Sequence, residues 1–285
     1  MSSGGQTKLA CVIGWPVAQS LSPRLHGHWL KEYGIRGSYV ALPVQREAFS
    51  TAVQSLRREG YRGASVTVPH KEAAFAIAHS VDDAAKAAGA VNQLVFLEDG
   101  MIEGLNTDAP GLAASLREAG VSLTGRPAIL LGAGGAARAA VLALNELGAA
   151  EIRILNRDRH RAEVLASNLS PASAATLVPM ELTDWRKVAG DTALAINATS
   201  AGMKGTPPLD LALKALAKDA AFCDIVYNPL ETELLKEART LHLKTIDGLG
   251  MLMHQAVPAF KAFFGVEPKV TGALRRELEQ ALRDG

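Results

Sequence analysis

The sequence predicts an α/β protein, of two domains or one large one, built on parallel or mostly parallel sheets. Its length of 285 residues exceeds the roughly 100–200 residues of a typical domain. With 48% hydrophobic residues, 26 glycines and 13 prolines, the composition is that of a folded protein, not of a disordered or collagen-like one. Short apolar runs alternate with longer amphipathic stretches, which is typical of βαβ units in a parallel sheet.

The expected elements form two series along the chain. In the first, strands at residues 9–13, 38–42, 64–68 and 93–97 alternate with helices at 23–33, 45–59, 71–79 and 81–87. The second opens with a helix at 110–118 and continues with strands at 128–131, 151–155, 193–197 and 221–224 and helices at 135–147 and 159–167. Helices at 250–264 and 271–283 close the chain. No repeat or low-complexity linker separates the series, so any domain boundary lies within ordered structure.

Charge and composition argue against several classes of function. The 30 basic and 29 acidic residues leave a net charge of +1, which gives no reason to expect nucleic acid or an anionic membrane. No segment reaches the ~18 apolar residues of a membrane span. The first apolar run ends at Gly14 and Pro16 and lacks the small-residue cleavage pattern of a signal peptide. Cys11 and Cys223 are expected to be buried, reduced thiols. We therefore expect a cytoplasmic protein without a metal, membrane or nucleic-acid partner.

A glycine-rich turn follows the expected strand at 128–131. It reads Gly-Ala-Gly-Gly-Ala-Ala over residues 132–137 and leads into an alanine-rich helix, the order of a dinucleotide-binding fingerprint. The first glycine permits a tight turn, the second lets the backbone approach a pyrophosphate, and Ala137 stands where a third glycine is common. The N–H groups at the start of the helix would then hold the anion. The expected contacts are Gly132, Ala133, Gly134, Gly135 and Ala136.

The end of the next strand selects between the two nicotinamide cofactors. NAD enzymes commonly place an acidic residue there, about 20 residues after the glycines, but here Asn156 takes that position. Arg157 and Arg161 follow, four residues apart, and can reach one face of a helix start. Because guanidinium groups bind phosphate through two hydrogen bonds, these residues favour NADP over NAD. Two alternatives stay open: the arginines form a solvated helix face, or Asp158 neutralises an arginine or holds a ribose hydroxyl.

Three polar clusters near the N-terminus are hard to explain as packing. Ser20 and Ser22 precede a helix, where Ser22 is an expected N-cap and the pair would suit a carboxylate. The second cluster, at residues 65–71, ends a strand and includes a lysine, at the place where α/β proteins bind ligands. The third lies on loops at residues 89–92 and 104–108 and supplies amide and carboxylate groups.

Together these segments resemble the shikimate dehydrogenase family, over nearly the whole chain. The shared motifs are residues 14–26 (GWPVAQSLSPRLH), 66–71 (VTVPHK), 89–92 (GAVN), 106–108 (NTD), 132–137 (GAGGAA), 156–157 (NR), 197–203 (NATSAGM) and 247–255 (DGLGMLMHQ). Motifs of this number and order are highly specific.

The resemblance implies the reduction of 3-dehydroshikimate to shikimate by NADPH, with Lys71 and Asp108 as the catalytic pair. Hydride addition to a ketone leaves an alkoxide that needs a proton, which a positioned ammonium can supply. The substrate-binding residues that it implies are Ser20, Ser22, Thr67, Asn92, Tyr227 and Gln255. It adds Thr199, Met203 and Gly248 to the cofactor-binding residues Asn156, Arg157 and Arg161 and the glycine turn. For Met203, simple core packing is the alternative.

The resemblance also implies that separate domains bind the substrate and the cofactor. Residues 1–106 with 248–285 would bind the substrate, and a Rossmann-like domain of residues 107–247 would bind NADP. Two positions depart from the family pattern: Ser65 stands where Asn is usual, and Asp158 stands where Thr usually follows the Asn-Arg pair. The rivals are an NAD-using quinate/shikimate dehydrogenase, an enzyme for an amino analogue, and a non-catalytic ligand sensor. A small-molecule substrate is expected, and a monomer or homodimer.

Overall fold

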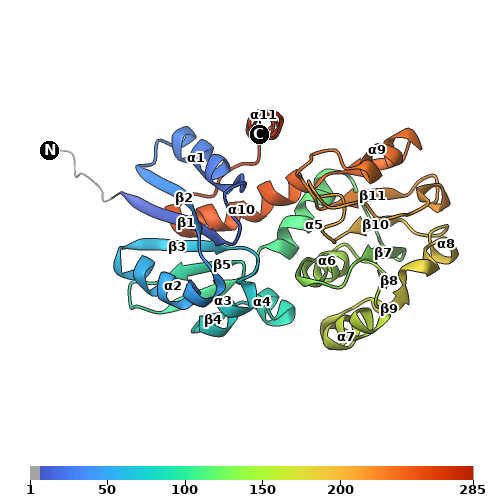
Figure 1. Cartoon of the computed structure of the whole chain (residues 1–285), viewed down its shortest axis with the longest axis horizontal. Coiled ribbons are helices and arrows are strands. Elements are labelled where there is room, and N and C mark those ends of the chain that lie inside the picture. The colour runs from blue at the N-terminus through green and yellow to red at the C-terminus, as the bar shows by residue number, and fades with distance from the viewer. Residues whose placement is uncertain (1–6, 285) are drawn as a thin grey trace. The chain divides into compact units, whose positions relative to one another are not determined.

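The computed structural model describes residues 7–284 and divides the chain into two compact units (Figure 1). Unit 1 comprises the chain up to Thr107 and from Gln255 onward, and unit 2 runs from Asp108 to His254. The second junction therefore falls inside helix α10 (Gly248–Phe264), whereas the sequence places it at the start of that helix. Residues 1–6 and 285 of the expected domain ranges lie outside the described residues.

Unit 1 is built on one six-stranded sheet. Its strands are β1 (Lys8–Gly14), β2 (Gly37–Pro43), β3 (Tyr61–Val66), β4 (Ser80–Val81), β5 (Gln93–Phe96) and β6 (Ile102–Leu105), in the order β2-β1-β3-β5-β6-β4. Strand β1 is parallel to β2 and β3, while β5 is antiparallel to β3 and β6. Because β1 and β3 are parallel, the segments that follow them, residues 15–22 and 67–71, emerge at the same edge of the sheet.

Helices cover both faces of this sheet (Figure 1). They are α1 (Ser22–Glu32), α2 (Phe49–Arg58), α3 (Lys71–Ile77), α4 (Asp83–Ala88), the second part of α10, and α11 (Gly272–Asp284), with a 3₁₀ turn at Arg46–Ala48. One face packs on α2, α3 and α4 through buried aliphatic side chains and Phe49. The other packs on α1 and α10 through an aromatic cluster, which contains His26, Trp29, Tyr39, Phe260, Phe263 and Phe264.

Unit 2 has a second six-stranded sheet, and all of its strands are parallel. These are β7 (Pro127–Leu131), β8 (Glu151–Asn156), β9 (Thr176–Glu181), β10 (Leu194–Asn197), β11 (Ala221–Asp224) and β12 (Lys244–Ile246), in the order β12-β11-β10-β7-β8-β9. The helices of this unit are α5 (Asp108–Glu118), α6 (Gly135–Glu146), α7 (Arg159–Leu169), α8 (Trp185–Val188), α9 (Glu233–Thr240) and the start of α10, with 3₁₀ turns at Ser170–Ala172, Leu182–Asp184 and Leu213–Ala215.

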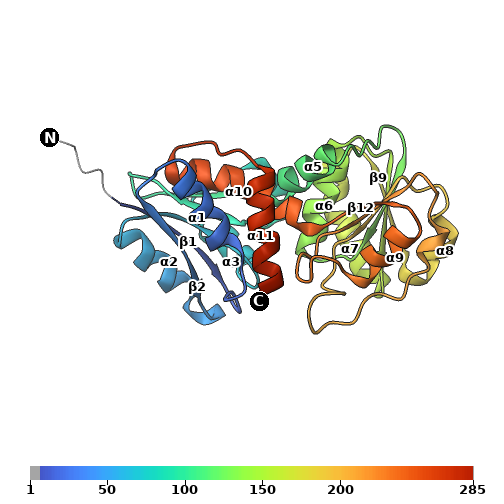
Figure 2. The same cartoon turned by 90° about the horizontal axis from the view of Figure 1, so that it is seen from above.

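Alternate residues of each central strand face opposite layers of helices. Ala128 and Leu130 of β7 point to the cluster shared with α5, α6 and α7, whereas Ile129 and Leu131 point to the cluster shared with α8 and α9. Figure 2 shows α6 and α7 on one side of this sheet and α8 and α9 on the other. A sheet buried on both faces explains why its strands read as continuous apolar runs.

The order of strands in unit 2 reverses at β7, whose neighbours are β8 on one side and β10 on the other. In open α/β sheets, ligands bind outside the carboxyl ends of the strands at such a reversal. Here those ends carry the glycine turn after β7 and the loop that begins at Ala198 after β10. The topology therefore brings together two segments that lie more than sixty residues apart in the sequence.

The α/β fold class is confirmed, while several individual elements differ from expectation. Strands β4, β6, β9 and β12 and helices α8 and α9 are additional. The helix expected at 81–87 begins at Asp83, because Asp82 is its N-cap and accepts a hydrogen bond from the Ala85 N–H at 2.7 Å. Strand β6 returns from β5 through a turn at Asp99 and Gly100, where Gly100 has a φ of +87°. Asp-Gly between two apolar runs is a hairpin signal.

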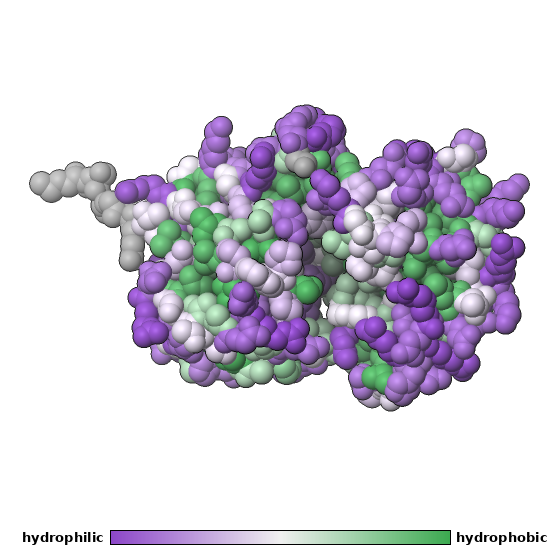
Figure 3. All heavy atoms as spheres, viewed as in Figure 1, coloured by the Kyte–Doolittle hydropathy of each residue, from purple (hydrophilic) through white to green (hydrophobic). Residues whose placement is uncertain are grey.

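Helix α11 is amphipathic. Helix α11 buries Leu274, Leu278 and Ala281 and turns its charged residues outward, so its exposed side is hydrophilic in Figure 3. Within residues 7–284, every helix is too short or too polar to span a bilayer.

Candidate active site

A cluster of three polar side chains, two of them buried, lies between the start of β5, the end of β6 and α10. The Asn92 Oδ1 accepts a hydrogen bond from the Thr107 N–H at 2.8 Å, and the Asn92 Nδ2 donates to the Thr107 Oγ1 at 3.0 Å. The Asn92 Nδ2 also donates to the Gln255 Oε1, on α10, at 3.4 Å. The structure thus brings together two predicted substrate residues, Asn92 and Gln255, through Thr107. That residue was not predicted as a site residue, although it lies within the 106–108 motif.

The two predicted catalytic residues each begin a helix. Lys71 is the first residue of α3, and its carbonyl accepts a hydrogen bond from the Val91 N–H at 2.9 Å, so the start of α3 is tied to the residue before Asn92. Asp108 is the first residue of α5, is 8% exposed, and directly follows Thr107. A carboxylate is electrostatically favourable at a helix N-terminus. Lys71 belongs to unit 1 and Asp108 to unit 2.

The predicted carboxylate ligands lie at the start of α1. The Ser22 N–H donates to the Ser20 Oγ at 3.3 Å, and Ser22 is 7% exposed. The expectation that Ser22 is an N-cap is wrong: the helix begins at Ser22, the N-cap is Leu21, and no side chain caps it. The chain enters this helix with Leu21 already in a helical conformation, so the Ser22 hydroxyl has no capping role.

Thr67 follows β3 and is held against the end of β1. Its N–H donates to the Ile13 carbonyl at 2.9 Å, and a Cβ added to Gly14 would lie 2.4 Å from the Thr67 Cγ2. Only glycine at position 14 therefore allows Thr67 this close approach. The α3 lysine and Thr67 thus belong to one short segment after β3, joined by the hydrogen bond from the His70 N–H to the Thr67 carbonyl at 3.0 Å.

The glycine turn after β7 has an open backbone suited to an anion. Gly132 has a φ of +107°, where a side chain would be strained, and its N–H donates to the Leu155 carbonyl at 2.8 Å. Gly134 is the N-cap of α6, so this helix has no hydrogen bond from its first N–H groups to an N-cap side chain. Added Cβ atoms on Gly134 and Gly135 would meet nothing within 4 Å. A ligand can therefore approach the backbone of this turn closely, and the first N–H groups of α6 are of the kind that bind phosphate.

The arginines after β8 fall into two kinds. Arg159 pairs with Glu163 at 3.0 Å, but in residues 7–284 no carboxylate pairs with Arg157 or Arg161, and both are exposed. The Asp158 carboxylate caps α7 by accepting from the His160 N–H at 3.0 Å. Within residues 7–284 Asp158 forms no ion pair with an arginine, and its carboxylate lies at the N-terminus of α7.

Neighbouring backbone holds Asn156 in place beside these arginines. The Asn156 Nδ2 donates to the Asp158 carbonyl at 2.8 Å, which closes the turn between β8 and α7. The amide thus orders the segment that carries Arg157, in the position where an acidic residue would select NAD.

The loop after β10 carries the predicted residues Thr199 and Met203. The Asn197 Oδ1 accepts from the Thr199 N–H at 3.1 Å and from the Thr199 Oγ1 at 2.7 Å. A Cβ on Gly132 would lie 2.8 Å from the Thr199 Cγ2, so this loop packs on the glycine turn. Met203 is 44% exposed, and core packing is therefore not its role.

Tyr227 and Gly248 come from adjacent segments of unit 2. The Gly248 N–H donates to the Val226 carbonyl at 3.3 Å, and an added Cβ on Gly248 would lie 2.1 Å from the Ile225 carbonyl oxygen. Any side chain at Gly248 would push α10 away from the backbone that leads to Tyr227. Burial raises the pKa of the Tyr227 hydroxyl, which keeps it neutral and able to donate a hydrogen bond.

Three histidines that lie in or near these motifs have structural partners. His26 stacks on Tyr39 with ring centroids 3.9 Å apart. The His70 Nε2 donates to the Val44 carbonyl at 2.7 Å, and the His254 Nε2 lies 2.8 Å from Glu118. Within residues 7–284, no group of three or more His, Cys, Asp and Glu residues is arranged to hold a metal ion.

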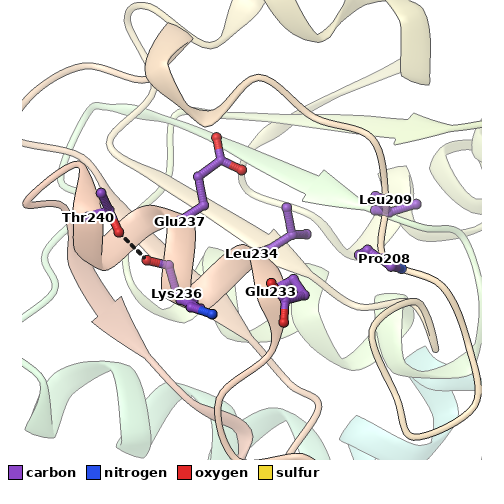
Figure 4. Close-up of a pocket in the computed structure, with 7 residues that line it drawn as sticks. All are labelled: Pro208, Leu209, Glu233, Leu234, Lys236, Glu237 and Thr240. Atoms are coloured by element: carbon purple, nitrogen blue, oxygen red, sulfur yellow. Dashed lines mark hydrogen bonds between the residues drawn. The ribbon is translucent and has the colours of Figure 1, made fainter.

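A surface pocket also lies beside α9. Figure 4 shows its lining: Pro208, Leu209, Glu233, Leu234, Lys236, Glu237 and Thr240. The Thr240 hydroxyl donates to the Lys236 carbonyl at 3.0 Å, and the Glu237 Oε1 accepts from the Leu213 N–H at 3.3 Å. Two of its polar groups are thus used within the fold, and none of the sequence-predicted site residues lines it.

Two family models match the chain. The model described as the shikimate dehydrogenase substrate binding domain matches residues 12–94, and the model described as shikimate / quinate 5-dehydrogenase matches residues 113–249. A Methylobacterium radiotolerans protein named shikimate dehydrogenase (NADP(+)) is 50% identical over 273 residues, which cover 94% of this chain and 95% of that protein.

Solved structures with similar folds include both cofactor types. Shikimate 5-dehydrogenase from Thermus thermophilus, in complex with NADP(H) and shikimate, aligns with a TM-score of 0.84 and 37% identity over 98% of this chain and 99% of that one. Quinate dehydrogenase from Corynebacterium glutamicum, in complex with NAD, aligns with a TM-score of 0.88 and 29% identity over 99% of this chain and 100% of that one.

Proposed function

The chain belongs to the shikimate dehydrogenase family, and we propose that its Lys71 and Asp108 carry out the reversible, NADPH-dependent reduction of 3-dehydroshikimate to shikimate. It is an NADP-dependent oxidoreductase. The chemistry that NADPH supplies when bound is a hydride for the carbonyl carbon. The Lys71 Nζ then gives a proton to the carbonyl oxygen, so that the ketone becomes a secondary alcohol. Asp108 accepts a hydrogen bond from a substrate hydroxyl and orients the lysine.

Different residues recognise the carboxylate of shikimate and its ring hydroxyls. We propose that the hydroxyls of Ser20 and Ser22, with Thr67 nearby, bind the carboxylate. Asn92 and Gln255 bind ring hydroxyls, and Tyr227 closes the pocket. The cluster of Asn92, Thr107 and Gln255 supports this assignment, because amide groups that already share hydrogen bonds are oriented before the substrate arrives.

The observation that carries the cofactor assignment is the exposure and ion pairing of the arginines after β8. Two exposed guanidinium groups, those of Arg157 and Arg161, lack a carboxylate partner within residues 7–284, while the carboxylate between them caps α7. Such groups suit the 2′-phosphate of NADP. The pyrophosphate would lie on the glycine turn, Gly132 to Ala136, and the ribose and nicotinamide against Thr199, Met203 and Gly248.

We further propose that residues 1–106 with 248–285 bind the substrate and that residues 107–247 bind NADP. The protein is expected to act in the cytoplasm as a monomer or homodimer. Unit 1 holds the Asn92 cluster and unit 2 holds the glycine turn and the arginines, which supports this division of labour.

A matrix of four assays tests the proposal. The purified chain is given shikimate or quinate with NADP or NAD, and kcat/KM is measured for each pair. We expect shikimate with NADP to exceed the other three pairs. A preference for quinate with NAD would favour the rival dehydrogenase, and the absence of turnover with all four pairs would favour a ligand sensor.

A further inference from the structure

A buried carboxylate that the proposed function does not use lies at the end of β11. Asp224 is 0% exposed, and within residues 7–284 its hydrogen-bond donors are all neutral groups. The Asn197 Nδ2 and the Val226 N–H reach its Oδ1 at 3.0 Å and 3.1 Å, and the Thr232 hydroxyl reaches its Oδ2 at 2.8 Å. Burial raises the pKa of the Asp224 carboxyl, and these hydrogen bonds oppose that rise. Burying a carboxylate is costly, and carboxylates with perturbed pKa values cluster at functional sites.

Through Asn197, this carboxylate orders the loop after β10. The same Asn197 Nδ2 donates to the Ala201 carbonyl at 3.1 Å, while the Asn197 Oδ1 accepts both hydrogen bonds from Thr199. Asp224 therefore fixes which way the Asn197 amide is turned, since only the Nδ2 can donate to it. The orientation of that amide in turn sets the position of Thr199, whose methyl group packs on Gly132.

Through Val226, the carboxylate orders the segment that leads to Tyr227. The Val226 N–H is held by the Asp224 Oδ1, and the Val226 carbonyl accepts from the Gly248 N–H. Gly248 lies close to the Ile225 carbonyl oxygen, so this segment packs directly against the start of α10. The position of the start of α10 thus depends on the backbone that Asp224 fixes.

Through Thr232, the carboxylate reaches the start of α9. The Thr232 hydroxyl donates to Asp224 and accepts from the Leu235 N–H at 3.3 Å as the N-cap of that helix. A Cβ on Gly202 would lie 3.5 Å from the Thr232 Cβ, so the loop that carries Met203 packs against this residue. Three donors on one carboxylate therefore connect four segments of unit 2.

We propose that Asp224 is a positioning residue for the nicotinamide half of the cofactor. It holds Thr199, Met203, Tyr227 and Gly248 in register through Asn197, Val226 and Thr232. This inference rests on the proposed function, because that function places the nicotinamide against these segments. The arginines that would hold the 2′-phosphate lie farther from Asp224: β11 is separated from β8, which leads to Arg157, by β10 and β7.

The substitution Asp224→Asn isolates the role of the second carboxylate oxygen. An asparagine keeps one acceptor for Asn197 and Val226 but presents an NH₂ group to the Thr232 hydroxyl, which then lacks an acceptor. Asp219→Asn is the matched control, because Asp219 lies in the same unit and pairs with Arg126 on the surface.

Calorimetric binding of two probes separates the halves of the cofactor. The probes are NADP and adenosine 2′,5′-bisphosphate, which contains the adenine half alone. In the Asp224→Asn variant we expect the Kd for NADP to rise about tenfold, because the segments that contact the nicotinamide half are displaced, while the Kd for the bisphosphate stays at the wild-type value. We also expect kcat to fall about 10- to 100-fold, because small displacements of reacting groups are costly. Asp219→Asn should match wild type throughout.

Two results would overturn the proposal. One is an Asp224→Asn variant with wild-type affinity for NADP, and the other is an equal loss of affinity for both probes, which would mean a general role in folding. If Asp224→Asn does not fold, Thr232→Val and Thr232→Ser replace it: the valine variant should lose NADP affinity selectively, and the serine variant should retain it. Because binding is measured without turnover, an inactive wild type would refute the proposed function and leave this comparison decisive.

Discussion

At the scale of single residues, Lys71 combines a charged side chain with a backbone that is tied to the Asn92 segment. A lysine in this position is suited to protonate an oxygen that gains negative charge in the transition state. We expect Lys71→Ala to lower kcat about 10²–10⁴-fold with little change in the Kd for NADP. Lys86→Ala is the matched control, since Lys86 pairs with Asp83 on an exposed helix. A near-normal kcat in the folded Lys71→Ala protein would remove this residue from the mechanism.

A substitution of Ser22 tests substrate binding without removing a helix cap. Because its hydroxyl does not cap α1, Ser22→Ala should leave the thermal midpoint of unfolding unchanged. We expect KM for shikimate to rise about tenfold or more and kcat to change little, since hydrogen bonds to charged groups contribute about 1.5–3 kcal/mol. Steady-state kinetics with calorimetric scans check both statements. An unchanged KM would show that the carboxylate binds elsewhere.

Arg157 and Arg159 form a natural pair of test and control on one short segment. Arg157 lacks a carboxylate partner in the described part of the chain, whereas Arg159 is held by Glu163. Arg157→Ala should raise KM for NADPH roughly ten- to a hundredfold, with little change in kcat/KM for NADH, which has no 2′-phosphate. Arg159→Ala should alter neither cofactor's kinetics. Equal wild-type kcat/KM values for NADPH and NADH would contradict the assignment to NADP.

At the scale of elements, the aromatic cluster that joins α1, β2 and α10 makes unit 1 sensitive to acid. Burial lowers the pKa of His26 from its ordinary 6.5 to about 3. Between these values the unfolded chain binds a proton that the folded chain does not. The free energy of unfolding therefore falls as the pH drops below about 6.5, and it stops falling near pH 3.

His26→Phe tests this linkage, because phenylalanine keeps the ring stacked on Tyr39 and cannot titrate. Between pH 7 and pH 5, the wild type should lose about 2 kcal/mol more unfolding free energy than the variant, as measured by urea denaturation at each pH. The exposed His160→Phe is the control and should retain the wild-type dependence. Parallel curves for wild type and His26→Phe would show that this histidine is protonated equally in both states.

At the scale of the whole molecule, the two units have separate cores and are expected to bind separate ligands. A ligand that binds only the folded state stabilises it by RT ln(1 + [L]/Kd), about 2.7 kcal/mol at a concentration of 100 Kd. NADP and shikimate should therefore each raise the midpoint of thermal unfolding. Arg157→Ala should reduce the shift with NADP alone, and Ser22→Ala the shift with shikimate alone. If each variant lost both shifts, the division of binding between the units would be wrong.

Local chemistry explains what could be predicted from the sequence. The strand, glycine turn and helix around Gly132 depend on neighbours within a dozen residues, and the buried strands of unit 2 are apolar runs because helices cover both faces. The α/β class, the family and the NADP assignment all derive from such contiguous motifs. Edge strands such as β9 and β12 were missed, since only one neighbour and little burial support them.

Only the tertiary structure decided how distant residues act together. It inserted the antiparallel β5 between β3 and β6. It also placed Thr107 between Asn92 and Gln255, and surrounded Asp224 with donors from the end of β10 and from the connection between β11 and α9. Hydrogen bonds of this kind join residues up to 163 positions apart. They form only after packing has removed water from both partners, so no local pattern in the sequence encodes them.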